Sequence, residues 1–181
     1  MEKMCTYEVY HATDASNVKK ILNEGFQYKP NDMHWLGNGF YFFLDQLLAQ
    51  KWAHDQIKGY GIIHNPVYIK CIIDINAEYV LDLRFLDEYN FAKECFSQFI
   101  TDSKGMFDYT NCDKRKLRTM FFNYMKKRYK YNCIIAYFLE RNLSQKIPQE
   151  NLFSEFKIPY IEVQLCIDRN KFITYKEEIK Q

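Results

Sequence analysis

Residues 33–43 read MHWLGNGFYFF, with Gly37 and Gly39 directly ahead of an aromatic run at 40–43. Aromatic side chains favour β-strands, whereas a glycine interrupts a strand or lets another group come close to the backbone. The stretch therefore predicts one of two arrangements. Either the glycines form a turn that feeds a buried strand, or they make room for a flat ligand against the backbone.

Strand-like and helical segments surround this stretch in a mixed order. β-branched, aromatic or alternating runs predict strands at 6–11, 40–43, 66–74, 78–82, 131–139 and 159–167. Helical spacing of apolar residues predicts helices after Asp14, after Asp45, and over 84–102 and 113–127. Because strands and helices do not alternate strictly, we expect an α+β protein with mainly antiparallel strands.

Local signals mark the ends of the first two helices. Asp14 or Ser16 can accept hydrogen bonds from the free N–H groups of a first helical turn, and Gly25 is typical of the position just after a helix. Asp45 can cap the second helix in the same way. Apolar spacing in that second helix predicts three inward-facing side chains, namely Leu48, Trp52 and Ile57.

The composition predicts a single domain over residues 1–181. Aromatic residues make up 18% of the chain, with fifteen Tyr and fifteen Phe, which predicts a dense core, a stacking surface or both. The six cysteines are scattered without a CxxC pair, so we expect reduced thiols and no metal site. The chain shows neither a signal-peptide pattern nor an apolar run long enough to span a membrane, which predicts a cytoplasmic protein.

One segment concentrates positive charge. Residues 113–131 hold eight Lys or Arg and one acid, a net charge of +7 in a chain whose total is +2. Such a segment predicts an anionic partner: nucleic acid, a phosphorylated ligand or an acidic antitoxin-like protein. Aromatic residues between the cations favour a single nucleic-acid strand. The alternative is a docked amphipathic helix with a solvated basic face, because one helical stripe carries Leu117, Met120, Phe121 and Tyr124.

Three short stretches carry the residues suited to chemistry. Residues 10–13 (YHAT) end the first predicted strand, residues 36–42 (LGNGFYF) contain the two glycines, and residues 161–165 (IEVQL) lie on a late strand. Strand side chains alternate, so Glu162 and Gln164 point to the same face. Taken singly, each stretch has a structural explanation: a hydrogen-bonded histidine, a turn, and an exposed strand carboxylate.

In combination, the three stretches resemble the ADP-ribosyltransferase superfamily, in the branch of diphtheria toxin and the poly-ADP-ribose polymerases. His11-Ala12-Thr13 is similar to that family's His-Gly-Thr/Ser strand end, and GNGFYF to its Gly-x-Gly-Ile-Tyr-Phe loop. Trp52, eleven residues after Tyr41, falls where the family has a second stacking aromatic. The sequence looks closer still to small bacterial proteins of this fold that are suspected toxins or anti-phage factors.

The resemblance covers residues 1–53 and, more loosely, 131–173. It implies split, mainly antiparallel β-sheets around an NAD cleft with flanking helices. It also implies that Tyr41 and Trp52 hold the cationic nicotinamide ring between two aromatic faces. The backbone at Ala12, where the family usually has Gly, would bind the carboxamide.

The resemblance also assigns roles in cleavage of the bond between nicotinamide and ribose. His11 and Thr13 would donate hydrogen bonds to ribose hydroxyls, and Gly39 would let the loop fold tightly beside the cofactor. Glu162 would act with His11 and Tyr41 in catalysis, because a carboxylate near the 2′-hydroxyl stabilises an oxocarbenium-like transition state. Gln164 is the alternative at that position: its amide could orient the ribose but could not take a proton.

The resulting prediction is a mono-ADP-ribosyltransferase that uses NAD without a metal and modifies a protein or a nucleic acid, as a toxin or anti-phage effector would. Two alternatives share the fold. An RNA 2′-phosphotransferase would need more arginines than the three stretches contain. A degenerate module that binds NAD or a protein partner without turnover is favoured by Ala12 and by Gln164 beside Glu162.

Overall fold

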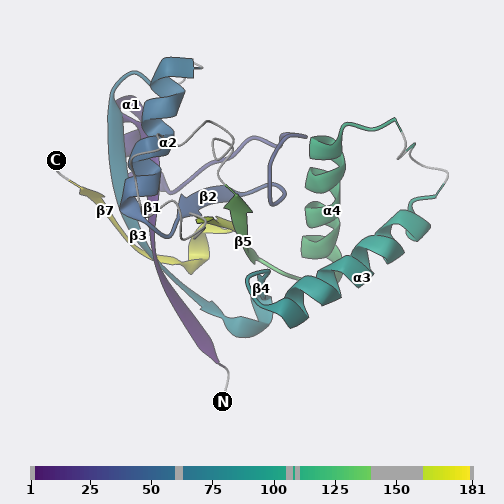
Figure 1. Cartoon of the computed structure of the whole chain (residues 1–181). Coiled ribbons are helices and arrows are strands. Elements are labelled where there is room, and N and C mark those ends of the chain that lie inside the picture. Colours follow the sequence, from purple (N-terminus) through teal and green to yellow (C-terminus); the bar gives the residue numbers. More distant parts are fainter. Residues whose placement is uncertain (1–2, 60–62, 105–107, 109–110, 140–160, 180–181) are drawn as a thin grey trace, which may run out of the picture.

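The computed structural model describes residues 3–59, 63–104, 108, 111–139 and 161–179. Four helices and seven strands lie within this part of the chain (Figure 1). In chain order they are β1 (Met4–Asp14), α1 (Ala15–Glu24), β2 (Phe40–Phe43), α2 (Gln46–Gly59), β3 (Pro66–Asn76), β4 (Val80–Asp82), α3 (Leu86–Asp102), α4 (Lys114–Tyr129), β5 (Cys133–Leu139), β6 (Ile161–Ile167) and β7 (Ile173–Ile179).

The described strands form one sheet in the order β4-β5-β6-β2-β1-β3-β7. Neighbouring strands in this sheet are antiparallel except β4 and β5, which confirms the expected α+β class with mainly antiparallel strands. The expectation of split sheets is wrong in the strict sense, because β1 and β2 are hydrogen-bonded neighbours. That joint is narrow, since its register consists of the single pair Tyr10 and Phe43.

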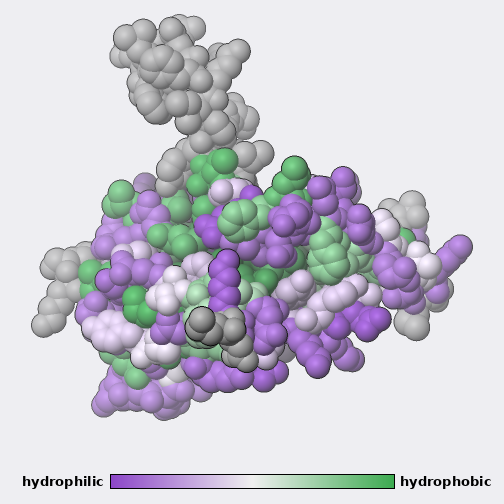
Figure 2. Space-filling view, turned by 90° about the horizontal axis from the view of Figure 1, so that it is seen from below, coloured by the Kyte–Doolittle hydropathy of each residue, from purple (hydrophilic) through white to green (hydrophobic). Residues whose placement is uncertain are grey.

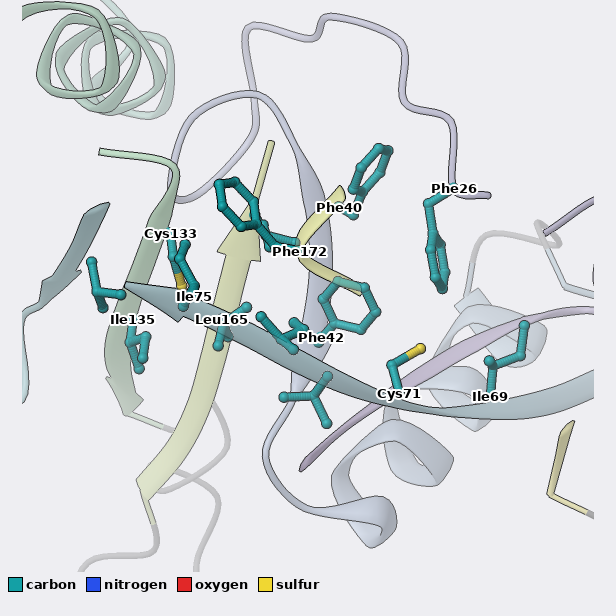
Figure 3. Packing of buried hydrophobic residues seen from close by; sticks show 14 of the residues in the cluster. Phe26, Phe40, Phe42, Ile69, Cys71, Ile75, Cys133, Ile135, Leu165 and Phe172 are labelled. Carbon is teal, nitrogen blue, oxygen red and sulfur yellow. The ribbon is translucent and has the colours of Figure 1, made fainter. Parts of the chain in front are cut away.

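The main hydrophobic core lies between the two parts of the sheet on either side of this joint. Alternate residues of β3, from Ile69 to Ile75, share one buried cluster with Phe40 and Phe42 of β2 and Leu165 of β6. In Figure 3, β3 runs across β5 and β6, and the labelled side chains of both parts meet between them. The interior therefore fixes the two parts of the sheet against each other, although few backbone hydrogen bonds join them.

Helices cover the remaining surfaces of the sheet. Helices α3 and α4 lie together beside β4 and β5, whereas α1 and α2 lie toward the opposite end of the sheet (Figure 1). Phe99 and Phe121 of the first pair pack on Ile134 and Cys166, which face away from the main core. The face shown in Figure 2 is largely hydrophilic, with apolar residues in small groups among polar ones.

Local helix signals in the sequence are confirmed at α1. Asp14 rather than Ser16 is the cap, and its carboxylate accepts a hydrogen bond from the Ser16 N–H at 3.0 Å. Gly25 follows the helix with a φ of 89°, in the left-handed region that favours glycine. At α2, the Asp45 carboxylate accepts from the Leu47 N–H at 2.8 Å, so the second cap is confirmed as well.

The predicted inward face of α2 is wrong for two of its three residues. Leu48 is buried, but Trp52 and Ile57 are 36% and 40% exposed. Ala49 and Ala53 are fully buried in their place. Small side chains let the helix approach the sheet closely, so the buried stripe follows the alanines and the larger apolar residues lie at its margin.

One strand prediction is wrong in part, one extends beyond the described residues, and one strand was not predicted. The strand expected at 78–82 begins as a 3₁₀ turn over Ala77–Tyr79, and only Val80–Asp82 pair as β4. Of the strand expected at 159–167, residues 159 and 160 lie outside the described residues. The edge strand β7 is not among the predicted segments, because ITYKEEI carries too few apolar residues to read as a buried strand.

The protein is expected to lose stability in acid, because the carboxylate of Asp14 becomes protonated there. This carboxylate also accepts from the N–H groups of His64 and Asn65, at 2.9 and 3.0 Å, so it ties α1 to the chain ahead of β3. These bonds hold the pKa of Asp14 well below its ordinary value. The stabilisation is therefore present above about pH 4 and is lost as the pH falls further.

Asp14→Asn is accordingly expected to lower the melting temperature at neutral pH. The difference in melting temperature between this variant and the unsubstituted protein, called the gap below, should decrease toward about pH 2.5. Thermal unfolding followed by circular dichroism across this range measures the gap. Asp55→Asn, at an exposed position of α2, is the matched control and should leave a small, constant difference. A gap at Asp14 that does not change with pH would contradict the assignment.

Candidate functional site

The three stretches singled out in the sequence lie on three adjacent strands, β6, β2 and β1. Gln164 of β6 pairs with Phe43 of β2, and Phe43 pairs with Tyr10 of β1. These residues therefore form one row across the sheet, and His11 stands next to the row. Residues more than 150 positions apart in the chain meet in this way at the narrow joint of the sheet.

His11 is held by a backbone carbonyl of the neighbouring strand. Its Nδ1 lies 2.8 Å from the carbonyl oxygen of Tyr41. The imidazole ring packs edge-on against Phe26, with ring centroids 5.0 Å apart. Burial lowers the pKa of His11, so the ring is neutral at pH 7. Because a carbonyl only accepts, Nδ1 carries the proton, and Nε2 is left as an acceptor rather than the expected donor.

A cavity of about 460 Å³ opens beside this histidine. His11, Thr13, Gly39 and Tyr41 all contribute to its lining, so the structure brings these four predicted residues to one place. Its other polar lining residues include Asn17, Lys20 and Lys29. Ala12 points the other way, because its side chain is buried with the alanines of α2.

The ring of Tyr41 lies on the opposite face of β2 from the main core. Its hydroxyl donates to the Gly37 carbonyl and accepts from the Leu36 N–H, each at 2.7 Å. Burial raises the pKa of Tyr41 far above its ordinary value. The phenol therefore anchors the glycine loop, and only the backbone carbonyl of Tyr41 reaches His11.

Replacing Tyr41 with phenylalanine is expected to lower the free energy of unfolding by about 1–3 kcal/mol, because the Leu36 N–H and the Gly37 carbonyl lose their partner. Urea unfolding measures the change. Tyr175→Phe is the control, since its exposed hydroxyl bonds only to Glu177 and its loss should cost less than about 0.5 kcal/mol. Equal losses in the two variants would contradict the anchoring role.

Trp52 stands beside Phe43 rather than opposite Tyr41. The ring centroids of Trp52 and Phe43 are 6.4 Å apart. Phe43 is a residue that the sequence argument missed. The alternation of strand side chains could have indicated it, because Phe43 shares the face of Tyr41 and lies nearer to α2 along the strand.

Glu162 and Gln164 point to the same face of β6, as predicted. The Gln164 side-chain amide donates to a carboxylate oxygen of Glu162. Gln164 lies in the row with Phe43, whereas Glu162 pairs with Phe138 of β5, farther from β1. The amide therefore lies nearer to His11 in the strand register, but neither Gln164 nor Glu162 lines the cavity beside His11.

The two glycines are required by close packing of their loop. A Cβ at Gly39 would lie 2.6 Å from the Ile167 carbonyl oxygen and 2.7 Å from Cys166 Sγ. Gly37 has a φ of +75°, and its Cβ would lie 2.7 Å from the Asn123 side chain of α4. The loop is thus pressed against β6 and α4, which favours the first of the two arrangements predicted from MHWLGNGFYFF.

The fold places different parts of the basic segment 113–131 in different surroundings. Two of its aromatic residues, Phe121 and Phe122, are buried and cannot stack on bases, and Tyr124 packs against Phe99 of α3 with ring centroids 5.2 Å apart. These contacts agree with the alternative of a docked amphipathic helix. The lysines at the end of α4 line a second cavity, whereas those at its beginning do not.

The described residues contain neither a cluster of three or more His, Cys, Asp or Glu that could hold a metal nor a helix long and apolar enough to cross a membrane. No family model matches the chain. A protein of Methanocaldococcus jannaschii, described only as uncharacterized, is 26% identical over 172 residues, which cover 93% of this chain and 73% of that protein. That description names no activity.

Proposed function

We propose that the chain is a mono-ADP-ribosyltransferase that cleaves NAD and transfers ADP-ribose to a macromolecular acceptor. The observation that carries the proposal is that His11, Gly39 and Gln164 lie on or directly beside three adjacent strands at the joint of the sheet, with Glu162 hydrogen-bonded to Gln164. Each of the three stretches is weak evidence alone. Their placement on adjacent strands supports a common site, and the single residue pair that joins β1 to β2 supports an ADP-ribosyltransferase-like fold.

The arrangement suits cleavage of the bond between ribose C1′ and the nicotinamide nitrogen. Nε2 of His11 would accept a hydrogen bond from a ribose hydroxyl, and the Thr13 hydroxyl lines the same cavity. Trp52 and Phe43 do not line this cavity, but together they would offer a partly exposed aromatic surface for the cationic nicotinamide ring.

In the reaction, nicotinamide leaves as a neutral molecule with the electron pair of the broken bond. Glu162 stabilises the positive charge that develops on the ribose. The acceptor nucleophile then bonds to C1′ and gives its proton to the carboxylate. Gln164 positions Glu162 through their hydrogen bond. The groups that act on the reacting atoms in this scheme are therefore those of Glu162 and Gln164 on β6.

A second candidate is a module that binds NAD or a protein partner without turnover. The observation that favours it is the position of Gln164, since an amide rather than a carboxylate lies in the row nearest His11. An amide can bind a ribose hydroxyl but cannot accept the proton of an acceptor nucleophile.

NAD labelled on its adenine side, incubated with the purified protein and cell lysate, tests both candidates. Nicotinamide release together with label on protein or on nuclease-sensitive material supports the transferase and identifies the acceptor class. Nicotinamide release without retained label would indicate an NAD hydrolase and contradict the transfer step. Binding of NAD with neither signal would favour the module without turnover.

A further inference from the structure

A second cavity, of about 670 Å³, lies where the end of α4 meets the connection between β6 and β7. Five cations line it: Lys126, Lys127, Lys130, Arg169 and Lys171. Asp168 is the one acidic residue among its described lining residues. The cavity therefore carries a large excess of positive charge, built from segments about 40 residues apart in the chain.

Little in the described structure neutralises these cations. Asp168 accepts two hydrogen bonds from the Asn132 amide, at 3.0 and 3.2 Å, and lies 3.9 Å from Arg169 Nε. Lys126 is fixed by donating to the Asn38 carbonyl at 2.7 Å. Among the described residues, Lys127 and Lys130 form no ion pair. A concave surface of this kind concentrates anions.

One aromatic side chain joins this cavity to the one beside His11. Tyr28 contributes to the lining of both. Tyr28 is 39% exposed, and its ring packs edge-on against Phe40 with ring centroids 5.3 Å apart. Lys20 and Lys29 line the cavity on the far side of Tyr28. Cations therefore line the cavities on both sides of a partly exposed aromatic ring.

We propose that this basic cavity binds a single nucleic-acid strand, with its phosphates on the lysines and a base stacked on Tyr28. Lysines around an aromatic platform are the usual means of holding a single strand, because every base has a flat face and every nucleotide a phosphate. Lysine binds a phosphate as a point charge, which suits binding without sequence preference. The inference goes beyond the proposed function, because strand binding needs no turnover of NAD.

Binding of a fluorescein-labelled strand of about 12 nucleotides, as poly-dT and as poly-U, tests the proposal in the absence of NAD. The triple variant Lys127→Gln, Lys130→Gln, Lys171→Gln should reduce the slope of log affinity against log salt by about 2, since each phosphate contact on a single strand contributes about 0.7. Tyr28→Leu should weaken binding by about fivefold or more with an unchanged slope.

The matched control removes the same number of charges at exposed positions outside both cavities, with Lys58→Gln, Lys93→Gln and Lys114→Gln. Thermal unfolding of each variant shows that it is folded. A loss of affinity for the labelled strand that is confined to the cavity variants supports the proposal. The proposal would be overturned by absence of binding at low salt, by an equal loss of affinity in the control triple variant, or by equal competition from polyglutamate of matched charge. None of these results would bear on release of nicotinamide.

Discussion

Replacing Glu162 with glutamine is expected to slow release of nicotinamide from NAD by about 100-fold or more. NAD affinity should change by less than about threefold, because the carboxylate acts mainly on charge that develops in the transition state. The substitution keeps the size of the side chain, and its new amide can still accept from Gln164. Single-turnover rates and a separate NAD titration measure the two effects.

Glu178→Gln is the matched control, since it makes the same change of charge at an exposed position of β7. It should leave the rate of nicotinamide release unaltered. A Glu162 variant with the unsubstituted rate would end the catalytic assignment. If Gln164→Ala then abolished NAD binding, Gln164 would be identified as the ribose-binding residue and the module without turnover would be favoured.

Features of the fold that depend on local chemistry could be predicted from the sequence. Asp14 and Gly25 mark the two ends of α1 because a carboxylate cap and a left-handed glycine are needed there whatever the helix packs against. The shared face of Glu162 and Gln164 follows from strand alternation alone. Both are properties of short segments, so no knowledge of the tertiary structure was required.

Features that depend on which segments meet could not be predicted. The exposure of Trp52 follows from the close contact of Ala49 and Ala53 with the sheet, and nothing within α2 fixes that rotation. The alternation of side chains along β2 places Tyr41 and Phe42 on opposite faces of the sheet, but the sequence does not indicate which of these faces α4 covers. The anchoring of the Tyr41 hydroxyl, and the neighbouring position of Phe43 and Trp52, are consequences of that choice.

Gly39→Ala is expected to lower the free energy of unfolding by about 3 kcal/mol, at the upper end of the range for overpacked interiors. The added Cβ would lie 2.6 Å from the backbone carbonyl oxygen of Ile167, in a central strand that cannot move aside without disturbing both of its neighbours. For a chain of this length, the melting temperature should fall by roughly 6–12 °C. Thermal unfolding at neutral pH measures the shift.

Gly59→Ala is the control for Gly39→Ala, because among the described residues nothing outside its own helix lies within 4 Å of the added Cβ, and it should leave the melting temperature unchanged or slightly raised. The pair also decides between the two arrangements predicted from MHWLGNGFYFF. Destabilisation by Gly39→Ala means that the glycine serves the packing of the loop on β6. Full stability combined with lost NAD affinity would mean instead that the glycine makes room for the ligand.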